Sequence, residues 1–233
     1  MGDSPLDEFT TARVAALKEL MSDRWSCRAF LDRPVPAEVS EELFTLAQLS
    51  PSWCNTQPWH LTVLEGRRLQ RIRDSLLEYV AHTAERPDYP FPSHYQGVHQ
   101  QRRRECAWLL YDAVGVSRGD RVASHAQALE NYRFFGAPSV AVLTTEESLG
   151  VYGAIDCGVY AGNFMIAAQA LGLGTIALAS LASHSPFFRE SLSLSPNRKI
   201  VMGIAYGYPD LAHPANGFRT SRAQIVDVVT RVS

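Results

Sequence analysis

The sequence lacks both a long apolar run and a strong excess of charge of either sign. No stretch approaches the ~20 apolar residues that a membrane-spanning helix needs, and 22 Lys and Arg against 24 Asp and Glu give a formal net charge of −2. This near-neutral balance argues against a protein that binds nucleic acid or a membrane surface. Asp3, Asp7 and Glu8 interrupt the first 20 residues, so we expect no secretory signal and a cytoplasmic location.

Cysteine is scarce, and the signature motifs of several enzyme classes are missing. Cys27, Cys54, Cys106 and Cys157 contain no Cys-x-x-Cys pair, which predicts free thiols rather than a disulfide framework or a zinc site. There is no P-loop and no Gly-x-Ser-x-Gly motif, and Gly172-Leu173-Gly174 lacks the third glycine of a dinucleotide-binding fingerprint. The 233 residues, 46% of them hydrophobic, suffice for one domain with a full core, which we place at residues 1–233.

Two arginines and a serine alternate in the segment Arg24-Trp25-Ser26-Cys27-Arg28-Ala29-Phe30. An extended chain would put Arg24, Ser26 and Arg28 on one face, and in a helix the two arginines would still be neighbours. Arginine binds phosphate or carboxylate through parallel hydrogen bonds, and no acidic run lies nearby to neutralise the pair. The segment is therefore a candidate anion site, although by itself it is more simply explained as a solvated surface with Phe30 in the core.

A second polar stretch runs from Ser50 to Trp59, bracketed by two prolines and two tryptophans. Its amides and hydroxyls can hydrogen-bond the edge of a planar heterocycle, as loop residues between regular elements often do. Together the two stretches resemble the FMN-dependent nitroreductase family, which has an Arg-x-Ser-x-Arg segment and, about one helix later, a Pro-Ser-x-x-Asn-x-Gln-Pro-Trp loop. The two motifs at this separation are far more specific than either one alone.

The later part of the chain extends the resemblance to nearly the full sequence. The segment from Arg102 to Leu110, followed by the run from Asn131 to Pro138, resembles the subgroup that is similar to nitrobenzoate reductases. The exit Gly207-Tyr208-Pro209 and the tail after it are also similar to the nitroreductases.

The resemblance implies that the protein binds FMN and uses NAD(P)H as co-substrate. Arg24, Ser26 and Arg222 would hold the flavin phosphate, and Arg28 would reach the pyrimidine edge of the ring. The complete set of cofactor contacts implied by the resemblance is Arg24, Trp25, Ser26, Arg28, Pro51, Ser52, Asn55, Asn131, Ala179, Ser180 and Arg222.

The remaining contacts are distributed along the flavin and between two subunits. Ser52 and Asn55 would come from the partner subunit's Pro-Ser loop, and Asn131 would bind the ribityl chain. The backbone at Ala179 and Ser180, which the sequence places where a strand leads into a loop, would face flavin N5. No side chain is expected to be an essential acid or base.

Four of these sequence features can also be explained without a ligand. Asn131 is also explained as a helix-terminal cap, and Arg222 as a surface charge. The basic run Arg102–Arg104 is, in the interpretation that we favour, a solvated helix face. The segment from Glu85 to Gly97, rich in proline and aromatic residues, is either an ordered cover over a pocket or a loop that packs on the domain surface.

The pattern of strands and helices leaves two architectures open. Strand candidates near His60, Ser139, Thr175 and Lys199 are separated by helical patterns, which would also suit a doubly wound parallel sheet. The resemblance favours an α+β fold with a mainly antiparallel sheet of about four or five strands, flanked by helices. It further implies an intertwined homodimer, with a C-terminal extension (about residues 210–233) that crosses the partner and the apolar helix Ala154–Leu171 near the subunit interface.

The function that the resemblance implies is ping-pong transfer of hydride through flavin N5 from NAD(P)H to a nitroarene, a quinone or a related electron-poor acceptor. Two departures from the family pattern matter. Trp25 stands where many relatives carry a second basic residue, so the flavin phosphate would lose one partner. Ala177-Leu178 replaces the Pro-Gln pair usual in the subgroup, which makes the wall near N5 more apolar and leaves the acceptor open. The alternatives are a reductive dehalogenase or a flavin-fragmenting enzyme on the same fold, and a non-catalytic FMN-binding protein. The choice between NADH and NADPH also stays open.

Overall fold

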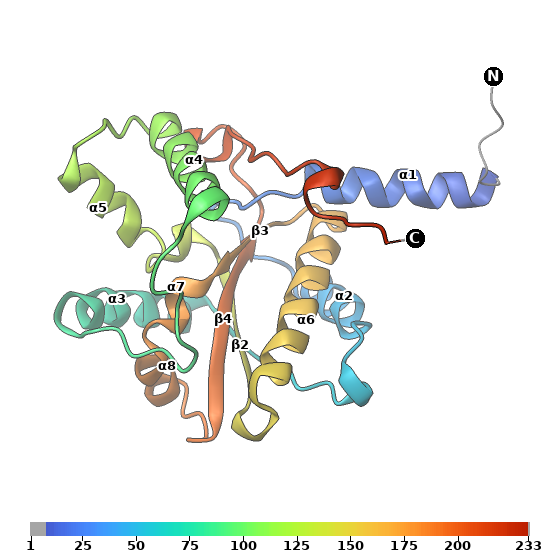
Figure 1. The fold of residues 1–233 in the computed structure, drawn as a ribbon. Helices are drawn as coiled ribbons and strands as arrows, with labels where there is room; N and C mark the ends of the chain where they lie inside the picture. The colour runs from blue at the N-terminus through green and yellow to red at the C-terminus, as the bar shows by residue number, and fades with distance from the viewer. Residues whose placement is uncertain (1–7, 233) are drawn as a thin grey trace.

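The central sheet contains four strands in this computed structural model, which describes residues 8–232: β1 (His60–Glu65), β2 (Ser139–Glu146), β3 (Gly174–Leu178) and β4 (Arg198–Gly207). They lie in the order β1-β2-β4-β3, and each neighbouring pair is antiparallel. All four strands lie where the sequence predicts them, and the α+β class with a mainly antiparallel sheet is confirmed (Figure 1).

Helices pack on both faces of the sheet (Figure 1). Residues of α2 (Ala37–Gln48) and α6 (Gly150–Ala170) share a buried cluster with Ala141 and Leu143 of β2. Val140 and Val142 point the other way, into a second cluster built with α3 (Gly66–His82), α7 (Ala179–Ala182) and α8 (Ser185–Ser191). A central strand covered on both faces is apolar at consecutive positions, which explains the unbroken run Val140–Leu143.

Three more helices lie outside these layers: α1 (Glu8–Asp23), α4 (Gly97–Ala113) and α5 (Arg121–Leu129). The 3-10 turns are Trp53–Asn55, Phe134–Gly136, Glu147–Leu149, Pro214–Asn216 and Ile225–Asp227. The first of these helices, α1, projects away from the body (Figure 1). None of its residues 8–23 is buried. Within residues 8–232, no helix combines the length and apolarity needed to cross a bilayer.

Two short helices differ from the sequence prediction. Helix α5 was not predicted. Its N-terminus is capped by the Asp120 carboxylate, which accepts a hydrogen bond from the Ala123 N–H at 2.9 Å. The predicted loop after β3 is wrong in part, because Ala179 to Ala182 form the single turn of α7. Such short elements have too few residues to show a helical repeat of apolar positions.

One glycine of β4 fixes how closely α7 approaches the sheet. A Cβ atom at Gly203 would lie 2.2 Å from Cδ2 of Leu181, a separation that real Cβ atoms do not adopt. The absent side chain therefore lets Leu181, which is fully buried, pack directly on the strand. This contact fixes α7, which begins at Ala179 directly after β3, against β4.

Candidate functional site

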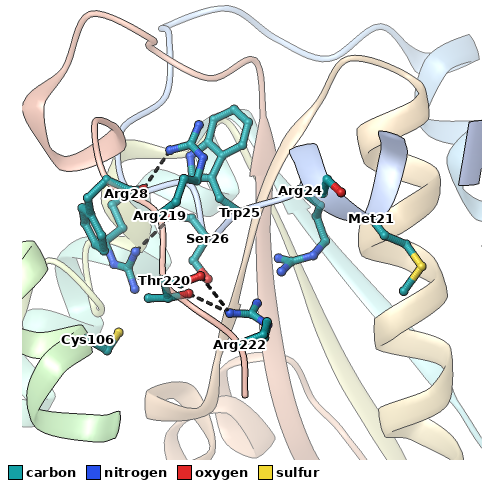
Figure 2. A pocket seen from close by; sticks show the side chains of 11 residues that line it. Met21, Arg24, Trp25, Ser26, Arg28, Cys106, Arg219, Thr220 and Arg222 are labelled. Atoms are coloured by element: carbon teal, nitrogen blue, oxygen red, sulfur yellow. Dashed lines mark hydrogen bonds between the residues drawn. The ribbon is translucent and has the colours of Figure 1, made fainter. Parts of the chain in front are cut away.

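Four arginines line one cavity of about 210 Å³, formed between the Arg24–Arg28 segment and the C-terminal tail. Figure 2 shows Arg24 and Arg222 directed toward the same space, with the Cys106 thiol of α4 on its other side. None of the described residues that line this four-arginine cavity is acidic; its cations are Arg24, Arg28, Arg219 and Arg222. The structure thus brings together the five predicted contacts Arg24, Trp25, Ser26, Arg28 and Arg222.

The Arg24–Arg28 segment is extended, as one of the two expected conformations requires. Ser26 forms a parallel bridge with Thr175 of β3, and the Cys27 N–H donates to the Thr175 carbonyl at 2.8 Å. Cys27 is fully buried, and burial raises the pKa of its thiol to about 11. The strand-like alternation therefore anchors Cys27 in the core while Ser26 and Arg28 line the cavity.

Asn216 ties the C-terminal tail to this segment. The Arg28 N–H donates to Asn216 Oδ1 at 2.7 Å, and Asn216 Nδ2 donates to the carbonyls of Ala29 and Asp210, each at 2.8 Å. Asn216 is buried, and these three bonds satisfy its side-chain amide. Asn216 therefore sets the path of the residues that follow it, including Arg219 and Arg222.

The cavity carries uncompensated positive charge. Burial and then the neighbouring positive charge of Arg222 lower the pKa of Arg24, and burial lowers the pKa of Arg28. Within residues 8–232, none of the cavity arginines forms an ion pair. Among the described residues, Arg222 donates only to oxygens of Thr220 and Ser221, its own neighbours in the chain. Such a cluster suits a dianionic phosphate group.

Trp25 stands where many relatives carry a basic residue, and Arg219 of the tail places a positive charge next to it. The Arg219 guanidinium carbon lies 4.1 Å from the centroid of the Trp25 ring, which is a cation–π contact. Trp25 Nε1 is buried and has no hydrogen-bond partner among residues 8–232. Arg219 was not among the predicted contacts, and its spacing of three residues from both Asn216 and Arg222 was the available signal.

The predicted Pro-Ser loop lies elsewhere and does not line the four-arginine cavity of its own chain. It contains left-handed backbone at Cys54, Asn55 and Gln57, with φ values of 50°, 55° and 47°. Non-glycine residues adopt this conformation only where their surroundings hold it. Ser52 helps to hold it, because its hydroxyl accepts a hydrogen bond from the Gln57 N–H at 2.9 Å.

A buried carboxylate on α6 fixes the same loop. Both oxygens of Asp156, which is 8% exposed, accept from the Trp53 N–H at 3.2 and 3.3 Å. The Trp53 ring also packs on Tyr152, with 4.7 Å between ring centroids. Asp156 was not predicted as a site residue, because a single acidic residue within an apolar helix carries no sequence signal of its contact with a distant loop. Asp156 and Tyr152 thus attach the Pro-Ser loop to α6 through Trp53.

Asn131, Ala179 and Ser180 also lie outside the four-arginine cavity. Asn131 follows α5, and its Nδ2 donates to the Ala128 carbonyl at 3.0 Å, which is the contact expected of a helix-terminal cap. Ala179 and Ser180 begin α7. The Ser180 hydroxyl is buried without a hydrogen-bond partner among residues 8–232. Their roles toward a flavin stay predictions.

The Glu85–Gly97 segment is fixed to the surface near α8 and β4. The Arg86 N–H donates to the Ser183 carbonyl at 2.7 Å. The Asp88 carboxylate pairs with Arg189 at 2.5 Å and accepts from the Ile200 N–H at 2.8 Å. No residue of the segment lines the four-arginine cavity. Its beginning is therefore an ordered loop with its own anchors.

Comparison with known proteins agrees with this geometry. The nitroreductase family model matches residues 21–208. The nitroreductase NfnB of Mycolicibacterium smegmatis is 36% identical over 227 residues, 96% of this chain and 95% of the relative. A 4-nitrobenzoate reductase of Nocardioides is 33% identical over 222 residues, 93% of this chain and 90% of the relative. The solved FMN-dependent nitroreductase NfnB from Mycobacterium smegmatis in complex with NADPH gives a TM-score of 0.89 at 35% identity, covering 94% of this chain and 99% of that chain. The chain therefore belongs to the nitroreductase family.

Proposed function

We propose that this protein is an FMN-dependent oxidoreductase that uses NAD(P)H to reduce nitroarenes, quinones or related electron-poor acceptors. The observation that carries the proposal is the four-arginine cavity, whose cations have no acidic partner among residues 8–232. Relatives with high coverage support the reaction class, since one is named nitroreductase NfnB and another 4-nitrobenzoate reductase. A cytoplasmic location fits a consumer of NAD(P)H whose four cysteines are free.

The residues present fit FMN. Arg24, Ser26 and Arg222 would hold the phosphate, because two of them are unpaired cations and the third is a hydroxyl in the same cavity. Arg28 would place a positive charge at the pyrimidine edge, where negative charge develops on reduction. The buried, unpartnered hydroxyl of Ser180 would gain a polar neighbour if the ring lay beside the start of α7. When bound, FMN supplies the two-electron chemistry that joins the two half-reactions.

We further propose a homodimer that completes the flavin site. The exposed side of α6 carries Val151, Ile155 and Val159, and a Cβ atom at Gly158 would meet no described atom within 4 Å. A partner that covers this face would meet the Pro-Ser loop, because Asp156 and Tyr152 attach that loop to α6. Ser52 and Asn55 would then serve the partner's flavin.

The two chain ends offer further surface to a partner. Phe9, Leu17 and Met21 of α1 are more than half exposed, and so are apolar residues of the tail, namely Ile225, Val226, Val228 and Val232. Exposed apolar surface of this extent is typical of a protein interface. We therefore treat residues 1–233 as one FMN-binding domain whose last part, from about residue 210, extends onto the partner.

Purification followed by spectroscopy and anaerobic turnover tests the proposal. We expect flavin absorbance, an FMN-dependent rise in melting temperature, and steady NAD(P)H oxidation when a nitroarene or quinone is added. Light scattering at low micromolar concentration should give a dimer. A colourless protein whose melting temperature ignores FMN would overturn the proposal, and tight FMN without turnover would indicate a binding protein. A monomer that holds FMN and turns over would refute the shared site.

A further inference from the structure

We propose that the groove between α4 and the C-terminal tail binds the adenosine end of NADPH and selects it over NADH through Arg102. This inference rests on the proposed function, since it concerns the nucleotide that reduces the flavin. The two nucleotides differ only by the 2′-phosphate of the adenosine ribose, so a selective site needs a free cation near a surface that accepts a planar base.

The groove has the size and the position that such a ligand requires. It measures about 640 Å³ and is walled on one side by α4 and on the other by residues 220–228 of the tail. This lies within the usual range of small-molecule sites, about 300–1,000 Å³. It shares Cys106, Thr220 and Arg222 with the four-arginine cavity, which at about 210 Å³ is too small to hold a dinucleotide as well. A nucleotide in the groove would therefore adjoin the flavin.

The groove combines free positive charge with apolar walls. Arg102 lines it and forms no ion pair within residues 8–232. Glu105, one turn further along α4, accepts a hydrogen bond from Ser221 Oγ across the groove at 3.5 Å instead of pairing with Arg102. Because Arg222 would hold the flavin phosphate, Arg102 is the described cation of the groove that remains for a second phosphate group. Apolar side chains from both walls, those of Val98 and Leu109 on α4 and of Ala223 on the tail, offer a surface for the adenine.

The basic run of α4 is therefore not uniform. Arg102 faces the groove, whereas the Arg103 guanidinium carbon lies 5.1 Å from the Tyr95 ring centroid. Arg104 lines neither the groove nor the four-arginine cavity. On a solvated helix face the three arginines would have equivalent surroundings. In the structure Arg102 differs from the other two, because it lines the groove. This difference supplies a matched control on the same helix, because Arg104 carries the same charge at nearly the same place.

Calorimetric titration of the FMN-loaded protein with 2′,5′-ADP and with 5′-AMP tests the site without turnover. We expect the wild type to bind 2′,5′-ADP at least about tenfold more tightly, the usual scale of one charge-assisted hydrogen bond. Arg102→Ala should reduce that ratio to about twofold, whereas Arg104→Ala should keep it. Equal affinities in the wild type, or equal losses in the two variants, would overturn the inference, because the preference would then be absent or would reflect only diffuse charge.

Steady-state kinetics give a second, independent measure. Arg102→Ala should raise KM for NADPH about tenfold with kcat unchanged, and should leave KM for NADH within about twofold. A similar rise for both nucleotides would refute the assignment of Arg102 to the 2′-phosphate. If the wild type oxidises neither nucleotide yet discriminates between 2′,5′-ADP and 5′-AMP, the proposed function fails and the site stands. If the enzyme is active but does not discriminate between 2′,5′-ADP and 5′-AMP, the proposed site at Arg102 fails and the proposed function stands.

Discussion

Replacing Arg222 with alanine should weaken FMN binding while leaving the flavin-free fold as stable as before. Arg222 is exposed, and in the described part of the chain its guanidinium donates only to Thr220 and Ser221, which are its sequence neighbours. Its positive charge also lowers the pKa of Arg24, which is the sign of like-charge repulsion. The side chain thus contributes little to the empty protein and has its main use toward an anion.

The magnitude follows from the type of contact that is lost. A hydrogen bond to a charged group contributes about 1.5–3 kcal/mol, so the dissociation constant of FMN should rise roughly 13- to 160-fold. The flavin-free protein should show an unchanged or slightly higher melting temperature, because one repulsion with Arg24 is removed. A residue with a structural role would change both quantities in the unfavourable direction.

Fluorescence titration of FMN into flavin-free protein measures the affinity, and thermal scans with and without FMN measure the stability. Arg222→Lys keeps the charge but loses the planar fork, so its affinity should lie between those of the wild type and the alanine variant. The reasoning fails if alanine leaves the affinity within about twofold of the wild type. It fails equally if the flavin-free melting temperature falls by several degrees.

Three further outcomes follow from the structure. Asp156→Ala should speed amide hydrogen exchange in the loop around Trp53, whose N–H loses its acceptor, and normal protection there would contradict the proposed anchor. Gly203→Ala should lower the free energy of unfolding in urea by about 1–3 kcal/mol through overpacking against Leu181, so an unchanged midpoint would count against that contact. Burial lowers the pKa of His184 below 6.5, so the unfolded chain binds the proton more readily than the folded chain. The free energy of unfolding should therefore fall as pH drops through about 6.5. His184→Gln should flatten the dependence of melting temperature on pH between about 5.5 and 7.5, and an equally steep curve in the variant would refute this.

The strands were predictable because their signals are local. The segment His60–Glu65 is followed by the helical pattern that begins at Gly66, and the apolar run after Pro138 becomes the buried central strand β2. The order of the strands is not local, since antiparallel and parallel arrangements suit the same spacing. Only the resemblance of the Arg24 segment and the Pro-Ser loop to a known family chose between them.

The candidate site was predictable only in part, because its geometry depends on contacts between distant residues. The sequence shows Arg24, Ser26 and Arg28 as an alternating set, and the structure keeps them on one cavity. The hydrogen bond between the Arg28 N–H and Asn216 joins residues 188 positions apart, and no repeat or spacing reveals such a pair. None of the residues of α1 is buried, and Phe9, Leu17 and Met21 stay exposed, so the described part of this chain does not cover the apolar side chains of this helix.

The tail connects the two parts of the site energetically. It contributes Arg219 and Arg222 to the four-arginine cavity, and its residues 220–228 also form one wall of the groove beside α4. Asn216 anchors only its beginning, while Ile225 and Val226 remain exposed. An anion that neutralises the arginines removes a repulsion that opposes docking of the tail, and a docked tail completes the groove. By linkage, any free energy that FMN contributes to ordering the tail returns as tighter binding in the groove.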